Sequence, residues 1–345
     1  MLITPDHYVL RMFHSQGIDL AKLGVRRVGA QAAAEAAAET KAEAEARDRA
    51  AWRLFCEHFG LFMGTPTGLW VRGVLRDMFG YEGPELQALD GAAADALYDE
   101  LAAQLASPQF SPRALLRRMR VVVLATTDAA TAPLSHHLQL QLEHAAEGDE
   151  EERLPRVIPT FRPDALLAVE QGEAWRARVR ELGELAFGAG SEPIASLDRF
   201  LEALRLRRLQ FKAAGAVATD HGTGAAEGAF TTELEAAAAA ALFQRAMAAA
   251  AGEGGAPPLA PSEARQFRGH MLLQMARMSC EDGLVMQLHL GVFRDHSAAL
   301  QAEYGPDKGG DIPVAAELTS ALRPLLQRYG AHPRLRLVVF TLDEA

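Results

Sequence analysis

The chain has 345 residues, of which 49% are hydrophobic and 23% are charged, a composition typical of a soluble globular protein. Its formal net charge of −10 argues against a nucleic-acid or anionic-membrane surface, since either would need a basic face. No window approaches 18 uncharged apolar residues and the N-terminus lacks a signal-peptide pattern, so we expect a cytoplasmic protein. The two cysteines, Cys56 and Cys280, have no metal-binding spacing, and we expect buried thiols without a disulfide.

The first third of the chain shows helical patterns, and no strand is evident before residue 120. Apolar spacing and capping residues predict helices over 6–16, 52–59, 69–79 and 90–105, and another that opens at Ser111-Pro112. Residues 29–48 are rich in Ala and Glu, which predicts an inserted helix that faces solvent and packs weakly. We therefore assign residues 1–119 to a helical region.

From residue 120 onwards, short β-rich runs alternate with longer helical segments. The runs cover residues 121–125, 156–160, 216–219, 285–290 and 335–342. Apolar runs separated by helices indicate parallel βα units, which are either doubly wound or closed into a barrel. We assign residues 120–345 to this second region.

Polar residues stand where four of these runs end: Asp128, Arg162, Asp220 with His221, and His289 with Arg294. Because the carboxyl ends of parallel strands build the active site in such folds, these residues predict a polar substrate pocket. The two arginines suit a carboxylate or phosphate, which implies an anionic substrate. Asp220 and His289 are acid/base or metal-ligand candidates.

Each candidate also has a structural alternative, which the sequence leaves open. Arg162 has an ion-pair partner within reach in Asp164, and an apolar strand around His289 is typical of a core histidine. For Asp220 and His221, the alternatives are an N-cap and a surface histidine. For His7 and Tyr8 they are an N-terminal turn and a packed aromatic, and His136 and His137 fit a helix surface. No Walker loop, dinucleotide fingerprint, serine elbow or H-E-x-x-H helix occurs in the sequence.

An ordered set of motifs carries a more specific signal. These are T-P-D-H-Y from Thr4, C-E-H-F-G from Cys56, T-T-D from Thr126, T-F-R-P-D from Thr160, T-D-H from Thr219 and Q-x-H-x-G-x-x-R from Gln287. In this order and spacing, the chain resembles uronate isomerase (glucuronate isomerase) of the amidohydrolase superfamily. The resemblance covers nearly all of the chain outside the Ala/Glu-rich tract.

The resemblance implies an α/β fold, a TIM-type (β/α)8 barrel of the amidohydrolase kind with an added N-terminal helical region, and about five of its eight strands in this chain. It implies interconversion of D-glucuronate with D-fructuronate, and of D-galacturonate with D-tagaturonate, by ring opening and proton transfer. No redox or nucleotide cofactor is needed for this reaction. The implied partner is a hexuronate, with no nucleic acid or membrane, and a homo-oligomer is left open.

The resemblance also implies roles for individual residues. His7, Tyr8 and His289 match catalytic residues, with Tyr8 as the proton shuttle, and Arg162 matches the arginine that receives the substrate carboxylate. Asp220 and Arg294 match further substrate-binding residues.

The sequence departs from the family pattern at the metal ligands and at one loop. The superfamily's H-x-H motif and its C-terminal aspartate ligand have no counterpart, so we expect a chain truncated at both ends. Zn²⁺ or another divalent metal is then expected only in a complete enzyme, with no ligand placed here. The family's T-T-D-D-P also ends as Asp128-Ala129-Ala130. Two alternatives remain: a non-catalytic fragment or pseudoenzyme that binds uronates, and a metal-dependent hydrolase of the same superfamily.

Overall fold

The computed structural model describes residues 7–146, 154–222, 230–252, 255, 257–289, 292–308 and 310–342. The chain divides into two compact units, here called unit 1 (Met1–Leu115 and Phe293–Ile312) and unit 2 (Leu116–Val292 and Pro313–Ala345). The first boundary lies close to the one expected at residue 119, although the expected domain assignment itself stays a prediction. Residues 293–312, which the sequence places in the second region, pack with unit 1.

Helices make up most of unit 1, as the sequence predicts. They are α1 (His7–Ser15), α2 (Ala30–Ala38), α3 (Lys41–Glu57), α4 (Pro66–Phe79), α5 (Gly91–Leu105) and α13 (Ala298–Tyr304), and α6 (Pro112–Arg118) leads towards unit 2. Local capping explains several of these boundaries. Thr65 and Asp90 each accept a backbone N–H at the start of a helix, and Gly80 ends α4 in the left-handed conformation. Within the described residues, no strand precedes residue 123.

An aromatic cluster forms the centre of unit 1. Phe13, Phe55, Phe59 and Phe62 are buried, and their contacting ring centroids lie 5.6–6.1 Å apart. Leu300 and Tyr304 on α13 join the same core. Burial of these apolar side chains is why the late segment 293–312 packs here rather than with the sheet that precedes it in sequence.

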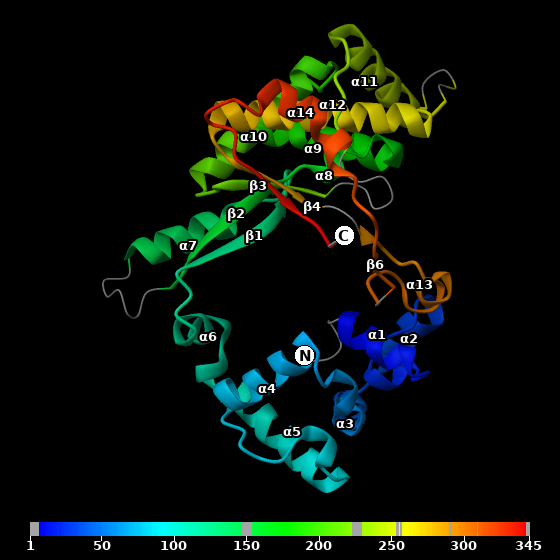
Figure 1. Cartoon of the computed structure of the whole chain (residues 1–345), viewed down its shortest axis with the longest axis vertical. Coiled ribbons are helices and arrows are strands. Elements are labelled where there is room, and N and C mark those ends of the chain that lie inside the picture. The colour runs from blue at the N-terminus through cyan, green and yellow to red at the C-terminus, as the bar shows by residue number, and fades with distance from the viewer. Residues whose placement is uncertain are drawn as a thin grey trace. The chain divides into compact units, whose positions relative to one another are not determined.

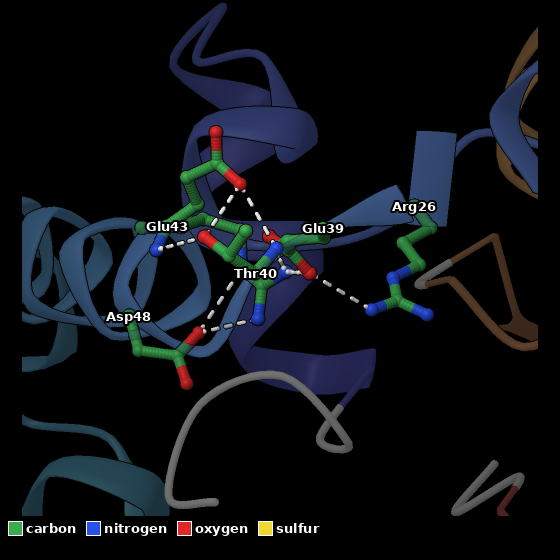
Figure 2. Close-up of polar contacts among 6 residues, drawn as sticks. Arg26, Glu39, Thr40, Glu43 and Asp48 are labelled. Atoms are coloured by element: carbon green, nitrogen blue, oxygen red, sulfur yellow. Dashed lines mark hydrogen bonds and ion pairs between the residues drawn. The ribbon is translucent and has the colours of Figure 1, made fainter. Parts of the chain in front are cut away.

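The Ala/Glu-rich tract forms two helices, and a polar cluster marks the corner between them (Figure 2). Thr40 begins α3 with a capping box, in which its hydroxyl accepts the Glu43 N–H and the Glu43 carboxylate accepts the Thr40 N–H. Just before it, Glu39 accepts hydrogen bonds from Arg26, at 3.1 Å, and from Arg47, at 2.6 Å. The single helix expected over 29–48 is therefore wrong. The side chains described on α2 are exposed, as expected.

The sheet of unit 2 has five strands. They are β1 (Val123–Ala129), β2 (Arg156–Arg162), β3 (Ala218–Gly222), β4 (Val285–His289) and β7 (Leu337–Phe340). Every adjacent pair is parallel and the order is β1-β2-β3-β4-β7, so the five predicted β-rich runs form one α/β sheet. The strand order follows the chain without reversal, which excludes the doubly wound alternative for this sheet.

Several strands end later than the sequence predicts. The β1–β2 ladder runs from Val123 paired with Arg156 to Ala129 paired with Arg162. Asp128 and Arg162, expected to follow their strands, therefore lie within them, because parallel pairing continues through these polar residues. Asp220 and His221 likewise lie within β3.

Helices cover one side of this sheet (Figure 1). The helices on that side are α8 (Asp164–Leu167), α9 (Glu173–Phe187), α10 (Leu197–Ala213), α11 (Ala236–Ala251), α12 (Pro261–Asp282) and α14 (Leu318–Tyr329), and α7 (Ser135–Ala146) packs on β2. Phe161 of β2 meets Phe211 of α10 edge to face, with centroids 5.1 Å apart. The helix-covered face is thus the apolar core side of the sheet, and the alternate residues of each strand point to its other face.

Two further expectations concern the whole chain. Cys56 and Cys280 are free and buried, as predicted, and burial raises the pKa of the Cys56 thiol to about 12. No helix among the described residues is long and apolar enough to cross a membrane.

Candidate active site

Three of the predicted site residues meet at the carboxyl ends of neighbouring strands in unit 2. Arg162 is the last residue of β2, Asp220 lies two residues before the end of β3, and His289 is the last residue of β4. The β3–β4 register pairs Asp220 with Gln287 and Gly222 with His289, which places Asp220 and His289 on the same face. Asp220 is hydrogen-bonded to His289 and forms an ion pair with Arg162 on this face.

The Arg162 guanidinium is shared between two aspartates. Its Nε donates to Asp164 Oδ2 at 2.7 Å, and its Nη1 lies 3.3 Å from Asp220 Oδ2. The side chain of Arg162 remains 41% exposed, whereas that of Asp220 is only 5% exposed. Burial by itself would lower the pKa of Arg162, but Asp164 and Asp220 together have the larger effect, so the pKa is raised. The structural pair with Asp164 is thus observed, and 41% of the Arg162 side chain remains exposed.

Gly222 allows the arginine to lie close to the backbone of β3. Its N–H donates to Asp164 Oδ2 at 2.9 Å. A Cβ atom at this position would lie 2.6 Å from Arg162 Nη2 and 2.7 Å from Asp164 Oδ2, closer than real contacts allow. Asp164 therefore joins the ends of β2 and β3, and burial raises the pKa of its carboxyl despite the arginine.

His289 forms the other end of this polar chain. Its Nδ1 is hydrogen-bonded to Asp220 Oδ1, and its side chain is 51% exposed. The core-histidine alternative is therefore wrong. Because an ionised carboxylate only accepts hydrogen bonds, a neutral His289 carries its proton on Nδ1 and its lone pair on Nε2. An Asp–His pair of this kind is suited to general acid–base chemistry.

His221, next to Asp220 in sequence, points to the opposite, helix-covered face. It is fully buried, and its Nε2 lies 3.0 Å from the Thr219 hydroxyl. Burial, followed by the nearby charges of Arg208 and Arg162, lowers the pKa of His221 to about 3. The alternative of an N-cap followed by a surface histidine is wrong, because both residues belong to β3.

A second polar cluster on unit 2 was missed by sequence analysis. The Thr126 hydroxyl donates to Asp128 Oδ2 at 2.6 Å and lies 2.8 Å from His137 Nε2. His137 is buried, so its expected place on a helix surface is wrong. A signal did exist, because His137, Gln141 and His144 follow the helical i, i+4, i+7 spacing. A search for apolar periodicity does not detect this set, because all three residues are polar and make hydrogen-bonding contacts to other segments.

The remaining predicted residues, His7, Tyr8 and Arg294, belong to unit 1, where His7 and Arg294 contact Asp311. Arg294 Nη1 lies 3.1 Å from Asp311 Oδ2, and His7 Nδ1 lies 3.8 Å from the same oxygen. Arg294 was expected at the end of the fourth strand. That placement is wrong, because Arg294 follows β5 (Val292–Phe293), which pairs with β6 (Ile312–Pro313) in a separate two-stranded sheet.

Tyr8 and Asp311 complete the description of this cluster. The Tyr8 ring centroid lies 4.5 Å from that of His7, and Tyr8 is 54% exposed, so it is not the packed aromatic of the structural alternative. Asp311 is buried and also accepts the Asp295 N–H at 3.0 Å. Sequence analysis missed Asp311, because no spacing or periodicity distinguishes it in its loop.

The described residues do not offer a complete set of metal ligands. No three His, Cys, Asp or Glu side chains among them group together in a way that could hold a metal ion. Asp220 and His289 provide two donors, whereas catalytic metal sites of this kind use three or more protein ligands. The residues present therefore do not fit a metal centre by themselves.

Unit 2 is thus an α/β unit with an arginine, an aspartate and a histidine at the carboxyl ends of its parallel strands. The family model described as glucuronate isomerase matches residues 31–345. The uronate isomerase of Nostoc punctiforme is 41% identical over 345 residues, which cover 100% of this chain and 64% of that protein. That of Xanthomonas axonopodis pv. citri is 42% identical, with 100% and 65% covered. This chain belongs to the glucuronate isomerase family.

Solved structures agree with this assignment. The chain superposes on glucuronate isomerase from Caulobacter crescentus with a TM-score of 0.80 and 37% identity, covering 99% of this chain and 63% of that one. For uronate isomerase from Thermotoga maritima, the TM-score is 0.77 and the identity 27%, with 99% and 65% covered. The chain thus spans just under two thirds of the length of these curated relatives and structures. None of these names supports the hydrolase alternative.

Proposed function

We propose that this protein is a uronate isomerase, an enzyme that interconverts D-glucuronate with D-fructuronate and D-galacturonate with D-tagaturonate. The observation that carries the proposal is the chain of contacts from Arg162 through Asp220 to His289 at the carboxyl edge of the sheet. Membership in the glucuronate isomerase family supports the choice of reaction.

Arg162 provides the site for the substrate carboxylate. Its planar guanidinium matches the geometry of a carboxylate, and its side chain is 41% exposed, so a ligand can reach it. The aspartates on Nε and Nη1 hold the guanidinium in place, which reduces the entropy lost when the substrate binds. A fixed carboxylate in turn fixes the sugar carbons relative to the acid–base groups.

The isomerisation requires ring opening and a proton transfer between adjacent carbons. A base removes the proton from C2 of the open aldose, and the resulting enediol receives a proton at C1. The C2 hydroxyl becomes a carbonyl and the C1 carbonyl becomes a hydroxyl, so no atoms or electrons are gained or lost. Asp220 and His289 supply the acid–base pair on unit 2, because Asp220 fixes the tautomer that leaves a lone pair on His289 Nε2.

The unit 1 residues keep the roles that the resemblance implies. Tyr8 serves as the proton shuttle, His7 as a polar contact near the sugar, and Arg294 as a second cation for the substrate. The exposure of Tyr8 and the pairing of His7 and Arg294 with Asp311 are compatible with these roles.

The finer structural expectations belong to the same proposal. A parallel sheet whose order follows the chain is the arrangement found in barrels, so we place the five strands in a (β/α)8 barrel of the amidohydrolase kind. The divalent metal, the cytoplasmic location and a homo-oligomeric state stay predictions.

The carboxylate-binding role of Arg162 is tested by the substitution Arg162→Met. Met retains an apolar stem of similar length but cannot pair with a carboxylate, and charge-assisted hydrogen bonds contribute about 1.5–3 kcal/mol. We expect kcat/KM for glucuronate to fall at least about tenfold, with a raised KM. Arg205→Met is the matched control, because Arg205 pairs with Glu202 on the surface of α10. Equal kinetics for Arg162→Met and wild type would remove Arg162 from this role.

A further inference from the structure

A face-to-face ring contact at the edge of the sheet has no part in the chemistry above. The imidazole of His289 and the phenyl ring of Phe340 lie with centroids 4.6 Å apart and planes inclined by 6°. Phe340 is the last residue of β7, and the strand register pairs it directly with His289 on β4. Paired residues of neighbouring strands point to the same face, so the stack follows from the register of the sheet.

The hydrogen bond to Asp220 and the stack on Phe340 restrain the imidazole in different ways. The hydrogen bond fixes the position of Nδ1 in a side chain that is 51% exposed. The flat aromatic partner restrains the tilt of the ring, because tilting the imidazole would lose the stacking contact. The carboxylate therefore sets the tautomer, and the phenyl ring sets the plane in which the Nε2 lone pair lies.

Phe340 is 43% exposed and is the last residue of its strand. Val338, two residues earlier on the same face, is 41% exposed and pairs with Gln287. Val338 therefore matches Phe340 in strand, face and exposure but pairs with a different residue.

We infer that Phe340 is a positioning residue, whose ring orients the His289 imidazole for proton transfer. The kinetic consequence rests on the uronate isomerase function proposed above, whereas the orientation of the ring does not. A residue that orients a catalytic base acts on the chemical step, so its loss lowers kcat more than it raises KM.

The test compares Phe340→Leu, Phe340→Tyr and Val338→Ala in the natural protein. The imidazole C–H signals of His289 are assigned by their loss in His289→Gln and read by two-dimensional NMR. A stacked phenyl ring shifts these signals upfield by its ring current. We expect the shift to disappear in Phe340→Leu and to persist in Phe340→Tyr and Val338→Ala. Unchanged His289 signals in Phe340→Leu would overturn the inference.

Kinetics provide the second readout. We expect kcat on glucuronate to fall by up to about tenfold in Phe340→Leu, the scale set by an aromatic pair. Phe340→Tyr should restore kcat to within about twofold of wild type, and Val338→Ala should leave it unchanged. An equal loss in Phe340→Tyr and Phe340→Leu would contradict the inference. If the wild type converts neither uronate, the proposed function fails, and the NMR comparison alone decides the role of Phe340.

Discussion

At the residue scale, strand alternation separates two adjacent polar residues into two environments. Asp220 lies on the same face of the sheet as Arg162 and His289 and contacts both, whereas His221 is buried beneath the helices beside Thr219. A histidine held neutral in this way makes stability depend on pH.

The lowered pKa of His221 predicts acid destabilisation of the sheet. In the unfolded chain His221 takes up a proton as the pH falls below about 6.5, whereas in the fold it resists protonation down to about 3. The unfolded state therefore binds more protons between these values, and the free energy of unfolding falls as the pH is lowered. We expect hydrogen-exchange protection of the β3 amides to fall about tenfold more in wild type than in His221→Gln between about pH 7 and pH 5. Equal losses of protection in the two proteins would show that His221 is not the titrating group.

The sequence was informative for some residues and silent for others. Arg162, Asp220 and His289 were predicted because charged residues at the ends of apolar runs stand out. Gly222 and Phe340 carry no such signal, since one acts through the absence of a Cβ atom and the other through the strand register. Neither effect is visible before the strands are paired.

At the element scale, the ends of β2 and β3 are joined through Asp164, which accepts hydrogen bonds from Arg162 and from the Gly222 backbone. Both hydrogen bonds depend on the close approach of the ends of β2 and β3.

Gly222→Ala tests this arrangement. The added methyl would meet the guanidinium and the Asp164 carboxylate, which are the ends of flexible side chains and can move aside. We therefore expect a stability change below about 1 kcal/mol but a rise of about tenfold in KM for glucuronate, since a displaced Arg162 binds the carboxylate poorly. The matched control is Gly73→Ala on α4, where the new methyl comes no closer than 3.9 Å to Asp77. An unchanged KM in Gly222→Ala would show that Arg162 does not need this approach.

Element boundaries were predicted less well than element types. The five β-rich runs and the helices α1, α4 and α5 of unit 1 were predicted, because hydrophobic periodicity and capping are local signals. The strands extend through Asp128 and Arg162 because pairing with a neighbouring strand overrides the local polar character. The break at Glu39 and Thr40 was missed, since the Ala/Glu composition favours a helix on both sides of it.

At the scale of the whole molecule, the chain consists of two compact units, each with its own apolar core. Sequence position did not predict that residues 293–312 pack with unit 1. Contacts between segments far apart in sequence, such as Tyr304 with Asp19, depend on tertiary packing that no local pattern encodes. The family, in contrast, was evident from motif order alone, and the comparisons confirm it.

The proposed isomerisation of hexuronates can be tested directly. The most direct measurement is the formation of fructuronate from glucuronate, and of tagaturonate from galacturonate, by the purified natural protein with and without Zn²⁺. We expect ketose formation from at least one uronate, with kcat/KM reduced in Arg162→Met and retained in Arg205→Met. Absence of any ketose product under both metal conditions would contradict it.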